Sequence, residues 1–247
     1  MRQEGKAAAV RRMEGHPALD SRRDDAEEIV LPTGSEAGLQ PDRTLHPLAQ
    51  TAEAGDEYIQ SLTLLCDSSF AGLRSTALTR DCVWSSETGY LPMDSIESWK
   101  IRYPGDGSQI SPQSAVLIAK PKYLILAIGA DNTADMQKDA FIDAYAALIR
   151  GLAKASPEAK IVCLTLCSVT ASYVGDDGMS GEKAQEINGW IRDLCIETGA
   201  FYGDLTPVLC VDGNLRADYA DGSGRALNTA GLRELIGYLR SHSLDAQ

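Results

Sequence analysis

The feature that most constrains the fold is the alternation of short apolar runs with amphipathic helical segments after residue 57. Four segments predict buried strands, at residues 61–66, 121–132, 159–170 and 199–209, and in the second of them Gly129 and polar residues follow the strand. Three segments between or after them repeat apolar side chains at helical spacing, at residues 141–156, 180–199 and 228–242. Such alternation predicts a mostly parallel sheet with helices on both faces. We therefore expect an α/β fold built as a three-layer sandwich.

Signals at the ends of the helical segments support these boundaries. Pro157 stops the first predicted helix, and Gly199 ends the second. Asn228 is a candidate N-cap for the third, because its side chain can accept a hydrogen bond from the first turn.

The polar residues that follow the strands indicate where a site would lie. Ligands of open parallel sheets bind at the carboxyl ends of the strands. Ser68 follows the first apolar run and Gly129–Asn132 follows the second. We expect these two turns to lie at the same edge of the sheet.

The first 54 residues differ from the remainder of the chain. They have no sustained periodicity and are rich in Ala, Glu, Asp, Arg, Gly and Pro. This composition predicts a disordered tail or tether over residues 1–54, followed by one domain over residues 55–247. No apolar run is long enough for a transmembrane segment, and the amino terminus lacks the apolar core of a signal peptide. We expect a cytoplasmic protein, or an extracellular or cell-surface protein if an export segment precedes Met1.

Charge and cysteine content restrict the partners. The net charge of -12 argues against nucleic-acid binding through bulk electrostatics. The six cysteines show no zinc-ribbon spacing, and Cys163 and Cys167 fall in an apolar run, where they are expected to be core residues. Disulfide formation between distant cysteines stays open. No cofactor is expected.

Three short motifs resemble blocks of the SGNH/GDSL hydrolase family of esterases and acylhydrolases. LLCDSSFAGL (64–73) resembles the first block, AIGADNT (127–133) the third, and YADGSGRALNTAG (219–231) the fifth. The order and spacing of the motifs extend the resemblance over roughly residues 56 to 243, and the lead-in DEYIQSLTLL resembles secreted or membrane-anchored Gram-positive members. The resemblance implies a flavodoxin-like sheet and an ancestral O-acyl ester hydrolase.

The resemblance places Ser68 at the position of the nucleophile. A serine hydroxyl needs a hydrogen-bonded base to attack an ester. In the ungapped register of the fifth block, Ala226 stands where the family has its histidine, and Ser223 stands where the family has its aspartate. An alternative role for Ser68 is to cap the helix that begins near Phe70. The histidines of the chain, which are expected to be surface residues, are His16, His46 and His242.

The oxyanion site of the resemblance is also altered. Asp131 stands where the family has an asparagine, and Asn132 comes next. A carboxylate there would repel a developing oxyanion, although a local shift could bring Asn132 into its place. Gly89 is a candidate for the glycine of the second block. Asp67, Asp131 and Asp135 are a minor hypothesis for a cation site, but we assign no metal.

Three functions remain open at this point. The first is a ligand-binding pseudoenzyme that recognises a small ester or an acylated carbohydrate. The second is an active serine esterase with a non-standard base. The third is a structural or interaction domain without a small ligand. An open cleft beside Ser68 would favour the first function over the third, whereas a cleft filled by Arg225 or by the amino-terminal tail would favour the third.

Overall fold

A computed structural model describes residues 43–247, which form an α/β fold around one parallel sheet. Six strands build this sheet: β1 (His46–Pro47), β2 (Leu62–Cys66), β3 (Val83–Trp84), β6 (Tyr123–Ala127), β7 (Lys160–Leu164) and β8 (Phe201–Gly203). Every pairing within the sheet is parallel. The predicted fold class is therefore confirmed.

The order of the strands across the sheet is β1-β8-β7-β6-β2-β3. Without the edge strand β1, this is the flavodoxin-like order, in which the chain reverses its direction of travel between β2 and β6. Leu62 pairs with Tyr123 and Cys66 with Ala127, so β2 and β6 end level with each other. The carboxyl ends of β2 and β6 thus form the switch point at which such folds bind ligands.

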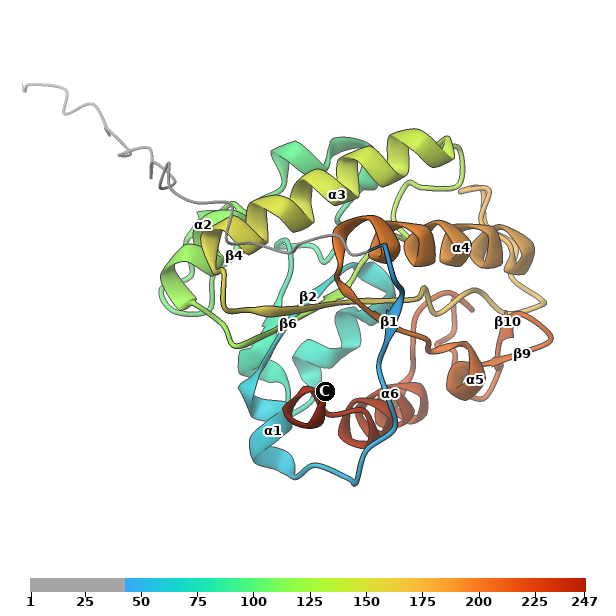
Figure 1. Ribbon diagram of the computed structural model, residues 1–247. Coiled ribbons are helices and arrows are strands. Elements are labelled where there is room, and N and C mark those ends of the chain that lie inside the picture. Colours follow the sequence, from blue (N-terminus) through green and yellow to red (C-terminus); the bar gives the residue numbers. More distant parts are fainter. Residues whose placement is uncertain (1–42) are drawn as a thin grey trace, which may run out of the picture. The chain divides into compact units, whose positions relative to one another are not determined.

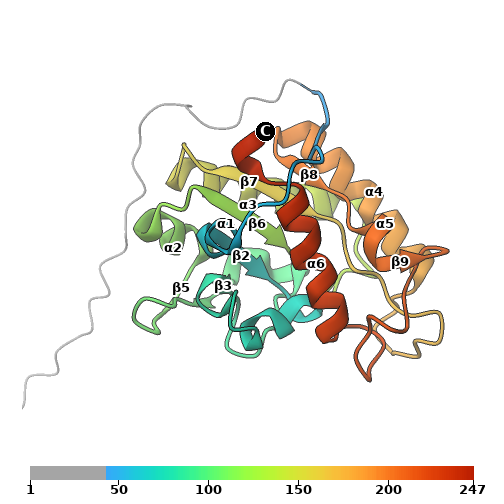
Figure 2. The same cartoon turned by 90° about the horizontal axis from the view of Figure 1, so that it is seen from below.

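Helices cover both faces of the sheet (Figures 1 and 2). One face carries α2 (Pro112–Ala119), α3 (Lys138–Ala155) and α4 (Gly181–Thr198). The other face carries α1 (Asp56–Ser61) and α6 (Thr229–Ser241), and α5 (Thr206–Leu209) packs against α6. The 3₁₀ segments are η1 (Ser68–Ser75), η2 (Arg80–Cys82), η3 (Met93–Ser98) and η4 (Leu244–Ala246). Two antiparallel pairs lie outside the sheet, β4 (Ile101–Arg102) with β5 (Gln109–Ile110) and β9 (Cys210–Val211) with β10 (Asn214–Leu215).

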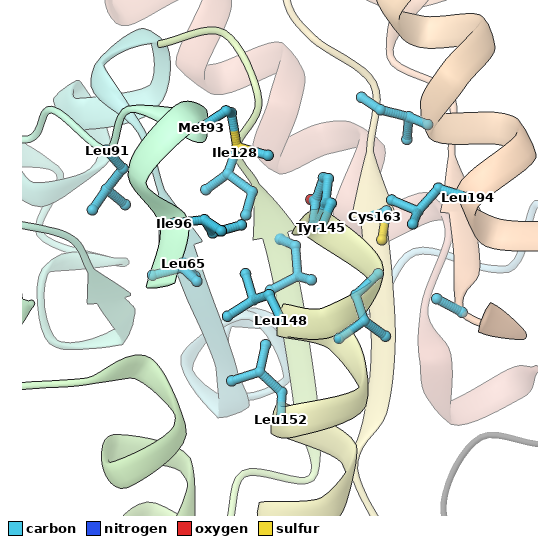
Figure 3. Packing of buried hydrophobic residues seen from close by; sticks show 14 of the residues in the cluster. Leu65, Leu91, Met93, Ile96, Ile128, Tyr145, Leu148, Leu152, Cys163 and Leu194 are labelled. Carbon is cyan, nitrogen blue, oxygen red and sulfur yellow. The ribbon is translucent and has the colours of Figure 1, made fainter. Parts of the chain in front are cut away.

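The alternation of side chains along the strands divides the core into two layers. On β2, Leu65 packs with the α3 side and Leu64 with the α6 side; both are buried. Figure 3 shows the first layer, where Tyr145 and Leu148 of α3 face the strands. Because both faces of the sheet are buried, its central strands β2, β6 and β7 are mainly apolar, and this explains why their sequences lack a polar–apolar alternation.

The predicted strands are correct in position but extend too far at their ends. The second was expected to end just before Gly129 and ends at Ala127; Gly129 has a φ of +124°, which turns the chain. The fourth, predicted over residues 199–209, splits into β8 and the short helix α5. Asp204 accepts a hydrogen bond from the amide of Thr206 and begins this helix.

The helix-end signals agree with the structure. Gly199 ends α4 with a left-handed φ of +74°, and Ser180, which was not among the predicted caps, caps the start of this helix. Asn228 Oδ1 accepts hydrogen bonds from the amides of Ala230 and Gly231, as predicted for the N-cap of α6.

The amino-terminal boundary requires a correction. The predicted tail over residues 1–54 falls largely outside the described residues, but residues 43–54 belong to the fold. His46 pairs with Phe201, Leu48 is buried, and the amide of Thr51 donates to the carbonyl of Ser241. A strand of two residues carries no periodicity, so sequence patterns could not reveal it.

All six cysteines lie in the described part of the chain, and all six are free thiols. Cys163 lies in β7 and is buried, as expected for a core residue. Over residues 43–247, none of the helices has the length and apolar character that crossing a bilayer requires.

Candidate functional site

The site begins with Asp67, which joins the ends of the two central strands. Its Oδ1 accepts a hydrogen bond from the amide of Ser69, and its Oδ2 accepts one from the amide of Ala130, at 3.0 and 2.9 Å. Asp67 therefore caps η1, and the alternative that Ser68 caps this helix is wrong. The same two hydrogen bonds hold Ser68 and Asp131 beside each other.

Asp131 lies directly against Ser68. Its side chain is completely buried, and its Oδ1 accepts a hydrogen bond from Ser68 Oγ. Its Oδ2 accepts hydrogen bonds from the amide of Ser68, at 3.2 Å, and from the amide of Leu91, at 2.8 Å. The carboxylate of Asp131 therefore accepts hydrogen bonds from the serine hydroxyl and from two backbone amides that point toward it.

Arg225 closes this arrangement from the opposite side. Its Nη2 donates to the carbonyl of Ala130 at 2.9 Å and lies 3.5 Å from Asp131 Oδ1. Its Nη1 forms an ion pair with Asp177, which lies between β7 and α4. The Arg225 side chain is 18% exposed, so its guanidinium is largely withdrawn from solvent. Arg225 thus connects the turn after β6 with two loops.

The buried carboxylates influence each other. Burial raises the pKa of Asp67 above its ordinary value, and the nearby carboxylate of Asp131 raises it further. Hydrogen bonds from the amides of Ala130 and Ser69, and the charge of Arg225, act in the opposite direction. Arg225 is therefore the cation that makes a second buried carboxylate tolerable here.

Asn132 and Gly89 do not reach Ser68 in the expected way. Asn132 adopts a left-handed φ of +54°, and its side-chain amide donates to Asp94 instead. Gly89 has a φ of +86°, and its amide donates to the carbonyl of Ser86. The backbone donor on Asp131 belongs to Leu91, two residues further along.

The turn that carries the fifth block does lie beside Ser68. The amide of Leu227 donates to the carbonyl of Ser69 at 3.1 Å, so Ala226 is adjacent to the segment of the nucleophile position. Ser223 is exposed, and its amide and hydroxyl both donate to Asp221. Ala226 and Ser223 supply neither a base nor a carboxylate to the site.

The two histidines of the described residues are remote from Ser68. His46 lies on β1, four strands away from β2, which corresponds to about 19 Å at the usual strand spacing. His242 follows the last residue of α6, while the start of α6 lies near Ser69, and a helix of this length spans about 20 Å. His242 stacks on Tyr238. The third histidine, His16, is outside the described residues.

The hypothesis of a cation site finds no support. Within residues 43–247, no group of three or more His, Cys, Asp or Glu side chains could hold a metal ion. Asp67 and Asp131 are close together, but they face backbone amides, Ser68 and Arg225. Asp135 does not complete a set of three ligands with them.

A family model now places these features in context. The model of the GDSL-like lipase/acylhydrolase family matches residues 67–235, which is more than half of the chain. The chain belongs to this family. The match begins at Asp67 and includes the turns that carry Ser68, Asp131 and Ala226.

Two solved structures are similar to this chain. An acylhydrolase from Bacteroides fragilis shares 11% identity over 72% of this chain and 83% of its own, with a TM-score of 0.51. A GDSL-like lipase from Bacteroides thetaiotaomicron shares 14% identity over 80% of this chain and 93% of its own, with a TM-score of 0.48. A search of curated proteins finds no match to the sequence.

Sequence reasoning missed two participants of the GDSL-family site and the main contact of a third. It assigned Asp131 to the oxyanion position but not to a direct hydrogen bond with Ser68 Oγ. It did not identify the amide of Leu91 or the carboxylate of Asp177. A backbone amide carries no sequence signal, and the Arg225–Asp177 pair joins two loops 48 residues apart in number. Only the order of the strands brings these groups together.

Proposed function

We propose that this GDSL-family domain does not hydrolyse esters at Ser68, and that its ancestral catalytic centre now holds loops of the fold together. The observation that carries the proposal is the position of Asp131. Its carboxylate accepts hydrogen bonds from Ser68 Oγ, from the amide of Ser68 and from the amide of Leu91.

Ester hydrolysis needs those donors for a different purpose. Acyl transfer passes through a tetrahedral intermediate whose negative oxygen requires preorganised hydrogen-bond donors. Here a fixed negative charge already occupies the amides of Ser68 and Leu91. A second negative oxygen at the same position would meet repulsion instead of stabilisation. The substitution at position 131 therefore opposes the transition state directly.

The missing base supports the same conclusion. Ala226 stands at the position of the family's histidine and cannot accept a proton. His46 and His242 lie on distant parts of the fold, as the strand order and the length of α6 require. Loss of triad members in serine hydrolases lowers turnover by roughly 10⁴- to 10⁶-fold.

The position of Arg225 favours a structural or interaction role over binding of a small ester at Ser68. Its guanidinium lies across the site and bonds Ala130, Asp131 and Asp177. A small ester or an acylated carbohydrate would have to displace this buried ion pair to reach Ser68. If the domain binds another molecule, we expect the binding surface to lie away from Ser68.

One observation favours a second candidate, an active serine esterase. Asp131 accepts the hydrogen bond of Ser68 Oγ and is thus a proton acceptor in contact with the nucleophile position. As a base it would have to release the amides of Ser68 and Leu91 during the reaction. This candidate and the proposal make opposite predictions for removal of the Asp131 charge.

Hydrolysis of p-nitrophenyl acetate by the full chain tests the proposal. We expect the same rate for the wild type and for Ser68→Ala, because the background does not depend on the serine. Turnover that disappears in Ser68→Ala would overturn the proposal. In that case, Asp131→Asn distinguishes the mechanisms, because it abolishes turnover if Asp131 is the base and raises turnover if Asp131 blocks the oxyanion donors.

Reconstruction of the family residues gives a sharper comparison. The double variant Ser223→Asp, Ala226→His restores the family's acid and base but leaves Asp131 in place. The triple variant adds Asp131→Asn, which returns the family's asparagine. We expect serine-dependent turnover in the triple variant to exceed that of the double variant. Equal turnover in both would show that Asp131 is not the obstacle.

A further inference from the structure

A surface cavity lies beside the edge strand β3 and does not include Ser68. Its volume is about 580 Å³, and its wall includes Arg74, Arg80 and Arg102. These residues come from η1, η2 and β4, so separate segments bring them to one place. Neither Ser68, Asp131 nor Arg225 lines this cavity.

The three arginines belong to the described arginines that form no ion pair with a carboxylate, as do Arg192 and Arg233. The sequence carries a net charge of -12, and Arg150, Arg216 and Arg240 each form an ion pair with a carboxylate. In contrast, among the ion pairs of the described residues, none includes an arginine of this cavity. Arginines without a carboxylate partner are free to bind an anionic ligand through their planar guanidinium groups.

The carboxylates of the cavity have other hydrogen-bond partners. Glu87 accepts a hydrogen bond from the side chain of Gln109, and Asp106 accepts one from the amide of Ser108. Asp81 also lines the wall. These three carboxylates balance the formal charge of the three arginines, so the guanidinium groups would bind an anion through directed hydrogen bonds and not through a net positive charge. The carboxylates also offer acceptors to the hydroxyl groups of a ligand.

One arginine is held in position by the fold. Arg74 Nη2 donates a hydrogen bond to the carbonyl of Ser86 at 2.6 Å, and Arg74 is only partly exposed. Arg80 and Arg102 are exposed and therefore accessible to a ligand. The cavity thus combines one guanidinium held by a hydrogen bond with two exposed ones.

An aromatic ring forms a further part of the wall. Tyr103 lines the cavity and contacts Trp84 edge-on, with ring centroids 6.0 Å apart. An adjoining cavity of about 510 Å³ shares Tyr103, Pro104 and Gly105 with the first. A ring of the size of a sugar can therefore contact Tyr103 while its charged group reaches the arginines.

We propose that this cavity binds a small polar molecule that carries a phosphate or carboxylate group, with Arg74, Arg80 and Arg102 as the anion-binding residues. The site is separate from Ser68, so its existence does not depend on the fate of the catalytic centre. Phosphate and carboxylate share the planar, bidentate recognition that guanidinium provides.

Isothermal titration of the full-length protein at low ionic strength tests the proposal with three probes. Glucose 6-phosphate carries a phosphate, glucuronate carries a carboxylate, and glucose carries neither. We expect one or both charged probes to bind at millimolar concentration or tighter, with affinity that falls as salt is added. Binding of glucose equal to that of the charged probes, or no binding of either charged probe, would overturn the proposal.

Variants locate the binding. Arg80→Ala and Arg102→Ala each remove an exposed guanidinium and should leave the fold intact. Each should weaken the charged probe by about 10- to 100-fold, as expected for a lost charged hydrogen bond. The matched control is Arg233→Ala, because Arg233 is exposed on α6 and does not line the cavity. Equal weakening in the control, or none in Arg80→Ala and Arg102→Ala, would also overturn the proposal.

Discussion

Arg225→Ala tests whether the former catalytic centre stabilises the fold. The guanidinium bonds the carbonyl of Ala130, lies 3.5 Å from Asp131, and forms an ion pair with Asp177. Its removal leaves the Asp131 carboxylate buried without its cation. The turn after β6 also loses its connection to the loop that carries Asp177.

The exposures of the partners determine the expected magnitude. Removing one member of a buried ion pair costs about 3 to 5 kcal/mol, whereas an exposed pair contributes about 0 to 1 kcal/mol. Asp131 is 0% exposed and Arg225 is 18% exposed, so the buried range applies. Asp131 keeps three other hydrogen-bond donors, which favours the lower end. We expect a loss of about 3 kcal/mol in the free energy of unfolding.

Urea denaturation at neutral pH measures this loss. The matched control is Arg216→Ala, because Arg216 pairs with Asp218 on the surface, with side chains 43% and 60% exposed. We expect the control to lose less than about 1 kcal/mol. If Arg225→Ala loses no more than the control, the centre does not hold the fold together and the reasoning fails.

A pH series separates the electrostatic part of the effect. Arg225 lowers the pKa of Asp67, so in Arg225→Ala the folded state binds the proton of Asp67 more tightly. A folded-state pKa that is raised supplies stability at low pH and loses it as pH increases. The deficit of Arg225→Ala should therefore be larger at pH 8 than at pH 5. A deficit independent of pH would assign the effect to packing alone.

Three further variants extend these predictions. Asp67→Asn removes a carboxyl group whose pKa is raised in the folded state, so the variant does not lose the stability that this group costs the wild type as it ionises. Between about pH 4 and neutral pH, the free energy of unfolding should therefore fall less in the variant than in the wild type, as measured by urea denaturation at several pH values. Asn228→Ala removes the N-cap of α6 and should cost about 1 to 2 kcal/mol, seen as a lower Tm; an unchanged Tm would contradict the role of the cap. Phe141→Ala empties a fully buried position between the rings of Tyr145 and Trp190 and should cost about 3 to 5 kcal/mol in urea denaturation, unless neighbouring side chains refill the space.

Much of the fold is predictable because it depends on local patterns. The spacing of apolar side chains in α3 and α4, and the cap residues Ser180, Gly199 and Asn228, act within a few residues of chain. The short strand β1 was not predictable, because a two-residue strand is defined by its partner β8 and not by its own sequence.

The candidate site was predictable only in outline. Ser68 and Asp131 were expected at neighbouring strand ends, and the hydrogen bond from Ser68 Oγ to Asp131 agrees with that placement. Whether Asp131 would face solvent, a metal or the serine depended on groups that sequence patterns do not locate. The amide of Leu91 is one such group, and its hydrogen bond spans 40 residues.

The amino-acid sequence by itself determined the alternation of strands and helices and the absence of a histidine at position 226, since both depend on which side chains follow one another along the chain. Only the tertiary structure decided what replaces the catalytic machinery. Asp131, Arg225 and Asp177 meet because parallel strands end at one edge of the sheet and bring their loops together. The physical reason is that a buried carboxylate needs hydrogen-bond donors, and the donors around Asp131 come from segments that are distant in the sequence.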